Sequence, residues 1–162
     1  MALIVLTSAS GSPGVTTSAL GLALSWPRPC LLVEADPTGG SGILAGYFHG
    51  DVAHTGGLMD LALAHREGTL AEAIARATMP IPHTGVQFLP GIRGHWQARS
   101  MVPVWEPLSG ALRALERNGQ DVNVDAGPRG LAGVSGPLSS AAHLPRLGTA
   151  GTPPPPTAAP SL

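Results

Sequence analysis

Short aliphatic runs alternate with helical segments along most of the chain, in the order expected of strands connected by helices. Three runs, each bounded by turn residues, predict strands: residues 3–6, 30–33 and 86–89. Four longer segments space their apolar side chains in a helical pattern: residues 16–26, 57–65, 70–77 and 104–117. Pro107 is expected in the first turn of the last helix. Residues 121–125 predict a fourth strand because they follow a helix and end on an aspartate near a glycine, although Asn123 interrupts their apolar run.

This alternation predicts an α/β fold, with a three-layer parallel sheet and flanking helices. The first two strands are joined through a helix, which is the connection that parallel strands require. A fold of this architecture normally continues past a fourth strand, so we expect the sheet to be incomplete. Residues 1–135 are expected to form the domain, and residues 136–162 to form a mobile tail rich in proline and alanine.

The amino-acid composition argues against several classes of function. Only 12% of the 162 residues are charged and the net charge is -1, so neither a nucleic-acid coat nor an acidic tail is indicated. All nine basic residues are arginines, so no ammonium group of a lysine is available to a site. The single cysteine excludes an internal disulfide framework. With neither a basic leader nor an apolar stretch long enough to span a membrane, we expect a cytoplasmic protein without a membrane segment.

The glycine-rich loop SGSPGVTT (10–17) lies between a predicted strand and a predicted helix, where backbone N–H groups and the helix dipole favour a phosphate. It resembles the deviant Walker A loop, KGGxGKTT, of the ParA/MinD family of P-loop partition and positioning ATPases. Ser10 and Val15 stand where that family has its two lysines. The resemblance implies a nucleotide-binding role for six residues: Gly11, Ser12, Gly14, Val15, Thr16 and Thr17.

Two further motifs follow in the family's order. LLVEADPTGGSG (31–42) is similar to the switch segment DxDPQxN, with Glu34 and Asp36 on its acidic positions. The resemblance makes Asp36 the candidate catalytic residue, beside the γ-phosphate and the attacking water, and Glu34 a supporting residue. VNVDAGP (122–128) resembles the Walker B strand, which implies that Asp125 holds Mg²⁺ through water together with the Thr16 hydroxyl. The resemblance extends over residues 1–135.

The family implies ATP and Mg²⁺ as cofactors, a role in DNA partition or cell positioning, a homodimer, a partner protein that stimulates hydrolysis, and nonspecific DNA binding. Loss of both lysines predicts weakened ATP binding. It also predicts impaired hydrolysis, by about 10² to 10³ in rate if one transition-state contact is lost.

Other interpretations of the same residues stay open. The glycine-rich sequence of the loop is also typical of a tight turn, and Asp36 before Pro37 is a common start of a turn. Thr16 and Thr17 would suit a helix start without any metal. The chain is then either a non-catalytic scaffold that keeps the fold and binds a partner protein, or a truncated product without a function.

Overall fold

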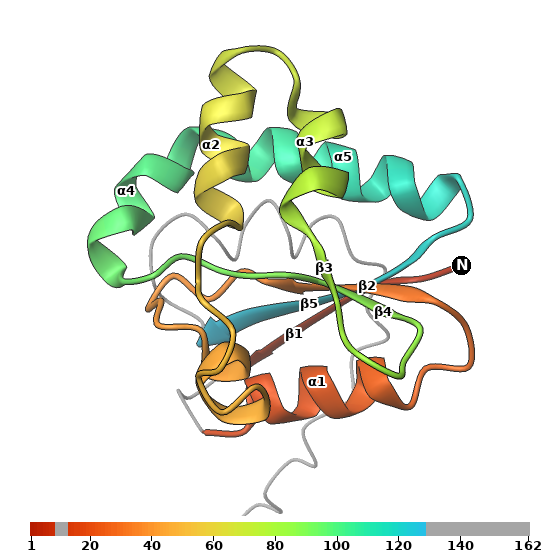
Figure 1. Cartoon of the computed structure of the whole chain (residues 1–162). Coiled ribbons are helices and arrows are strands. Elements are labelled where there is room, and N and C mark those ends of the chain that lie inside the picture. Colours follow the sequence, from red (N-terminus) through yellow and green to blue (C-terminus); the bar gives the residue numbers. More distant parts are fainter. Residues whose placement is uncertain (9–12, 129–162) are drawn as a thin grey trace, which may run out of the picture.

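The computed structural model describes residues 1–8 and 13–128, which fold around one five-stranded sheet (Figure 1). The strands are β1 (Leu3–Ser8), β2 (Cys30–Glu34), β3 (Met79–Pro80), β4 (Val86–Leu89) and β5 (Asp121–Pro128). Their order across the sheet is β1-β5-β2-β4-β3. The first four strands in this order run parallel, and β3 pairs antiparallel with β4.

Helices connect the strands and cover both faces of the sheet. They are α1 (Val15–Leu24), α2 (Leu58–Arg66), α3 (Leu70–Ala77), α4 (Ala98–Met101) and α5 (Trp105–Arg117), with the π-helix η1 (Ile43–Tyr47) and the 3₁₀ turns η2 (His95–Gln97) and η3 (Val102–Val104). Figure 1 shows α1 below the sheet and α2 to α5 above it. None of the described helices is long and apolar enough to cross a bilayer.

The hydrophobic core consists of two clusters, one on each face of the sheet. Leu58 and Trp105 belong to the cluster under α2 to α5, together with Val122 and Val124 of β5. Ala19 and Ala23 of α1 belong to the other cluster. The small alanine side chains let α1 approach the sheet closely, which brings the start of α1 near the strand ends.

β5 lies in the middle of the sheet, although polar residues alternate with its valines. Asp121, Asn123 and Asp125 are all buried, and the odd-numbered residues of a strand share one face of the sheet. Asn123 donates an Nδ2–H hydrogen bond to Cys30, whose cluster lies against α1, so this polar row lies on the α1 face. Asp121 is the first residue of β5, and Asp125 lies four residues further along the strand.

The predicted fold class is confirmed, and so are the four predicted strands and four predicted helices. The sequence pattern predicts no strand in the turn-rich stretch 79–85, but Met79–Pro80 is an edge strand, a place where proline is tolerated because its missing N–H faces away from the ladder. Residues 91–99, for which the sequence pattern predicts neither a helix nor a strand, include η2 and the start of α4. The expected tail at 136–162 and the end of the expected domain lie outside the described residues.

Candidate functional site

The carboxyl ends of β1, β2, β4 and β5 meet at one edge of the sheet. Asp125 pairs across the sheet with Leu6 of β1 and with Glu34 of β2, so two acidic residues become neighbours there. The backbone N–H of Ala35 donates to the Asp125 carbonyl at 2.7 Å and extends the ladder past the end of β2. In parallel α/β sheets, this edge is where ligands bind.

The N-terminus of α1 points to the same edge. Gly14 caps the helix at φ 106°, a left-handed conformation that glycine adopts without strain. Its carbonyl accepts the Ser18 N–H at 2.8 Å, which closes the first turn. Thr16 and Thr17 lie in that turn, and the Thr16 hydroxyl donates a hydrogen bond to the Asp125 carboxylate. The first turn of α1 and β5 are therefore joined directly.

Asp125 is fully buried, and its two carboxylate oxygens differ. One oxygen, Oδ1, accepts the Gly127 N–H at 3.1 Å. The other, Oδ2, has no hydrogen-bond partner among the described residues. Burial raises the pKa of Asp125, hydrogen bonds from Thr16 and Gly127 act against this rise, and the charge of Asp36 adds to it. A buried carboxylate with an unused oxygen is the kind of group that a ligand satisfies.

Asp36 stands just after β2 and is held by its own turn. Its Oδ1 accepts hydrogen bonds from the Thr38 N–H at 2.8 Å and the Thr38 hydroxyl at 2.7 Å. A Cβ placed on Gly127 would lie 2.5 Å from the Asp36 carboxyl carbon, so this approach requires glycine at position 127. Asp36 is thus fixed between the switch segment and the end of β5.

Glu34, the last residue of β2, is 4% exposed and joins two loops. Its Oε2 accepts the Gly91 N–H at 3.1 Å, and its carboxylate also accepts hydrogen bonds from Ser41. The Ser41 hydroxyl in turn accepts the Leu44 N–H at 3.1 Å. Burial raises the pKa of Glu34, although these hydrogen bonds lower it in part. Glu34 therefore holds the switch segment against the turn after β4.

These residues surround a small cavity of about 160 Å³. It is lined by Thr16, Glu34, Asp36, residues 39–42, Gly91 and Ile92. Two carboxylates and no arginine are among these lining residues, and Asp125 adds a third carboxylate beside them through its contact with Thr16. The described residues include no group of three or more His, Cys, Asp or Glu side chains placed to hold a metal ion by themselves.

The structure brings together three of the residues that the motifs singled out, namely Thr16, Asp36 and Asp125. Gly14, Val15 and Thr17 lie in or beside the first turn of α1 but do not line the cavity. Gly11 and Ser12 lie outside the described residues. Six cavity residues were not singled out from the sequence: Gly39, Gly40, Ser41, Gly42, Gly91 and Ile92. Their signals are weak, since GGSG and Pro-Gly are what any turn contains.

Solved structures share this arrangement of strands and helices. McdA of Cyanothece matches 88% of this chain with a TM-score of 0.63 and 23% identity, over 55% of its own length. The septum site-determining protein MinD of Pyrococcus horikoshii, solved with Mg-ADP, matches 87% with a TM-score of 0.65 and 21% identity, over 54% of its length. The chain has the fold of the ParA/MinD-type P-loop ATPases.

The ParA/MinD-type fold predicted from the three motifs is thereby confirmed, and the chain spans about half the length of the proteins it matches. Cobyrinic acid a,c-diamide synthase of Mycobacterium smegmatis also matches, with a TM-score of 0.57 and 22% identity over 87% of this chain and 56% of its own. The ParA/MinD-type fold therefore accompanies different activities, and the function has to be argued from the site. No protein-family model and no curated protein matches the sequence.

Proposed function

We propose that the chain is a ParA/MinD-like nucleotide-binding protein, related to ATPases that partition DNA or position cell machinery, with weakened ATP binding and slow or absent hydrolysis. The observation that carries the proposal is the meeting of Thr16, Asp36 and Asp125 between the N-terminus of α1 and the carboxyl ends of the strands. Each of the three motifs contributes one of these residues. In this proposal the protein acts in the cytoplasm as a homodimer, with a partner protein and nonspecific DNA as further ligands.

The oxygen atoms at this edge suit Mg²⁺. Mg²⁺ prefers carboxylate, hydroxyl and water oxygens, and the buried Oδ2 of Asp125 lacks a partner among the described residues. In the proposed site the Thr16 hydroxyl would bind the ion, Asp125 would hold it through water, and Asp36 would orient the water that attacks the phosphate. Bound Mg²⁺ would neutralise phosphate charge, and the chain's own residues would orient the phosphate and the water.

The same site suits a triphosphate less well. No arginine lines the cavity, and three carboxylates lie in or beside it. Val15 stands where the P-loop lysine would carry a positive charge to the phosphates. A charge-assisted hydrogen bond contributes about 1.5–3 kcal/mol, which corresponds to about ten- to a hundredfold in affinity. We therefore propose that the chain binds Mg-ATP weakly and that one substitution raises the affinity.

Isothermal titration with Mg-ATP tests this proposal on the whole chain and on Val15→Lys. Val15→Met is the matched control, since it lengthens the side chain without adding charge. We expect weak binding by the chain and by Val15→Met, and binding tighter by about tenfold or more by Val15→Lys. Tight, magnesium-dependent binding by the unmodified chain would contradict the weakened site. A folded Val15→Lys protein that binds no nucleotide would contradict the nucleotide-binding function.

One observation favours a second candidate, a non-catalytic scaffold that keeps the fold and binds another protein. Among the described residues, carboxylates line the cavity without a compensating basic side chain, an arrangement that repels an anion unless a cation accompanies it. A scaffold would show the same thermal unfolding midpoint with and without Mg-ATP, whereas a nucleotide-binding protein gains stability from a bound ligand. The comparison needs only a thermal unfolding measurement at saturating nucleotide.

A further inference from the structure

A wide groove runs along α2 on the side that faces α4 and η3, away from the candidate site. Its volume is about 630 Å³. The lining residues are Met59, Ala62, Leu63, His65 and Arg66 of α2, with Ser100, Pro103 and Val104 from α4 and η3. Leu63 is 59% exposed, and Val102 of η3 is 56% exposed. Both are large aliphatic side chains that stand free of the core, beside a groove with an apolar lining.

The α2 residues in this groove follow one face of the helix. Met59, Ala62, Leu63 and Arg66 have the spacing i, i+3, i+4, i+7, which places them in one stripe along α2. Such a stripe forms the ridges and grooves into which another helix packs. α2 is nine residues long, so about two turns of a second helix could lie along it.

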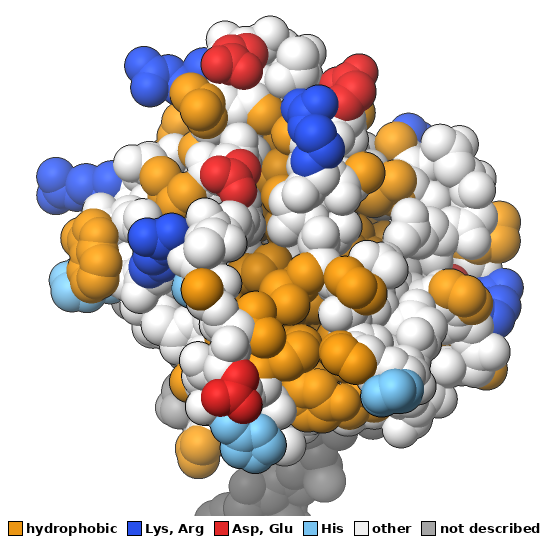
Figure 2. Space-filling model, viewed as in Figure 1, with side chains coloured by type: hydrophobic (Ala, Val, Ile, Leu, Met, Phe, Trp, Pro, Cys, Tyr) orange, Lys and Arg blue, Asp and Glu red, His pale blue; other side chains and the backbone are white. Residues whose placement is uncertain are grey.

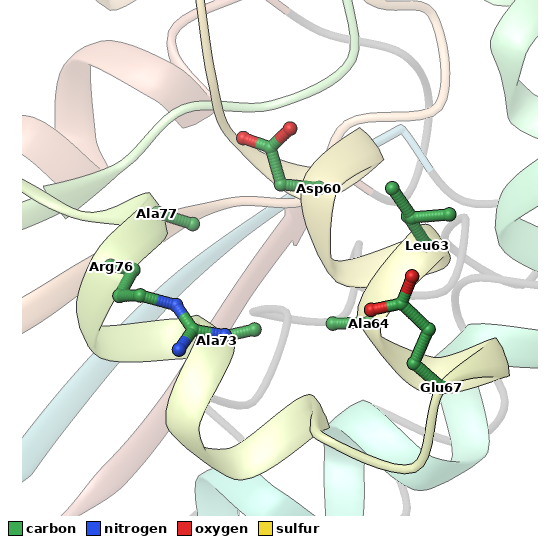
Figure 3. A pocket seen from close by; sticks show the side chains of 7 residues that line it. All are labelled: Asp60, Leu63, Ala64, Glu67, Ala73, Arg76 and Ala77. Carbon is green, nitrogen blue, oxygen red and sulfur yellow. The ribbon is translucent and has the colours of Figure 1, made fainter.

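Arg66 is the one charged side chain among the residues that line the groove, and no carboxylate is among them. A smaller groove of about 260 Å³ on the other side of α2 differs, because carboxylates of Asp60 and Glu67 and the guanidinium of Arg76 surround it. Figure 3 shows Ala64 and Ala73 facing each other across this smaller groove, with the charged groups around its rim. In Figure 2, arginine side chains project at the left of the molecule, beside α2 and α4.

We propose that the groove between α2 and η3 is a docking site for an amphipathic helix of another protein, aliphatic on one face and flanked by Asp or Glu. The aliphatic face would cover Leu63, Val102 and the floor of the groove, and a carboxylate would pair with Arg66. Helix-in-groove binding of this kind uses anchors at the same i, i+3, i+4, i+7 spacing. Complementary charge selects the partner and speeds its association more than it adds affinity. The groove shares no lining residue with the cavity of the candidate site.

Two synthetic helical peptides test the proposal by fluorescence anisotropy with the whole chain. Both carry leucines at i, i+3, i+4 and i+7; one has glutamates at the flanking positions and the other has lysines there. We expect the glutamate peptide to bind and the lysine peptide to bind at least about tenfold more weakly. Leu63→Gln and Arg66→Glu should each lower the affinity for the glutamate peptide by about tenfold or more, because they remove the central anchor or reverse the charge.

Arg76→Glu is the matched control, because it makes the same charge change in the groove on the other side of α2. It should leave peptide affinity within about twofold, and thermal unfolding should show that all three variants are folded. Equal binding of both peptides, no binding of the glutamate peptide, or equal effects of Arg66→Glu and Arg76→Glu would overturn the proposal. Self-association of the chain that Leu63→Gln abolishes would also overturn it, since the occupant would then be a second copy.

Discussion

Glu34 and Asp125 hold carboxyl groups in the interior, where apolar side chains would stabilise the fold more. Burial raises the pKa of both groups, which means that their ionised forms cost stability at neutral pH. Structural networks also bury acids, but those acids normally have every oxygen paired. Asp125 leaves one oxygen without a partner among the described residues. This combination is typical of sites where stability has been given up for ligand binding.

Glu34→Gln should raise the free energy of unfolding at neutral pH by about 1 kcal/mol, because it removes a buried charge and keeps an acceptor for Gly91. The folded-state pKa of Glu34 lies above its ordinary 4.5. The stability that the neutral form provides is therefore complete below pH 4.5 and is lost as pH rises through the folded-state pKa.

Urea unfolding of both proteins across this pH range measures the effect. The wild type should lose stability relative to Glu34→Gln as the pH rises, and the two curves should converge in acid. An advantage of the variant that is independent of pH would show that packing, and not the charge of Glu34, causes the difference.

Sequence motifs could place Thr16, Asp36 and Asp125, because each stands at a fixed position in a short, ordered pattern. They could not reveal what Glu34 does. Its hydrogen bond to Gly91 joins residues 57 apart in sequence, and such contacts exist only once β2 and β4 are paired. Nor could they show that no arginine among the described residues reaches the cavity, since that depends on how the loops fold back over the strand ends.

At the scale of elements, the N-terminal end of β5, away from the candidate site, connects several elements through Asp121. The Asp121 carboxylate accepts hydrogen bonds from the Ala2 N–H at 2.7 Å and from the Trp26 indole N–H at 2.9 Å, and it forms an ion pair with Arg28 at 2.7 Å. One side chain thereby joins the start of β1, the segment after α1 and the start of β5. Burial acts to raise the pKa of Asp121, but the hydrogen bonds from Trp26 and Ala2 and the charge of Arg28 hold it below its ordinary value.

Asp121→Ala should lower the free energy of unfolding by about 2 kcal/mol or more, because the N–H groups of Ala2 and Trp26 lose their acceptor. Arg28→Met should cost less than about 1 kcal/mol, since the Arg28 side chain is 54% exposed and water screens its charge. The stability that ionised Asp121 contributes is present above pH 3.8 and is lost as pH falls through its lowered pKa. Chemical unfolding at neutral and acid pH measures both effects, and equal losses in the two variants would contradict the hydrogen-bond explanation.

Elements with an uninterrupted apolar pattern, such as β2, could be predicted from the sequence directly. β5 was predicted mainly from its position after a helix, because its polar residues break the apolar run. Each of these polar residues is buried, and their hydrogen-bond partners come into reach only in the folded protein. β3 could not be predicted. Two residues that include Pro80 carry no strand pattern, and their pairing depends entirely on the position of β4.

At the scale of the whole molecule, the sheet separates two hydrophobic clusters but also joins them. The central strands contribute side chains to both: Leu31 and Val33 pack under α2 to α5, while Cys30 and Leu32 pack against α1. Loss of either layer would expose one face of these strands and remove packing that the other layer needs. We therefore expect the described domain to unfold as one unit.

Leu32→Ala and Leu58→Ala test this expectation from opposite faces of the sheet. Both side chains are fully buried, so each variant should lose about 2–4 kcal/mol in a single transition. Leu24→Ala is the control, since Leu24 is 37% exposed and should lose much less. Circular dichroism and tryptophan fluorescence should give the same midpoint for each protein. Separate transitions, or a variant that alters only one signal, would show two independent layers.

The position of β5 also has a consequence for protein synthesis. β5 is the last of the five strands in sequence but lies between β1 and β2. While the polypeptide emerges from the ribosome, the edges of β1 and β2 that pair with β5 therefore stay unpaired until residues 121–128 have been synthesised. The aliphatic side chains of these strands stay exposed for the same time. Strand pairing over such long separations is slow and exposes a nascent chain to aggregation. Productive folding in the cell should depend on chaperones that shield this interval more than on the stability of the finished domain.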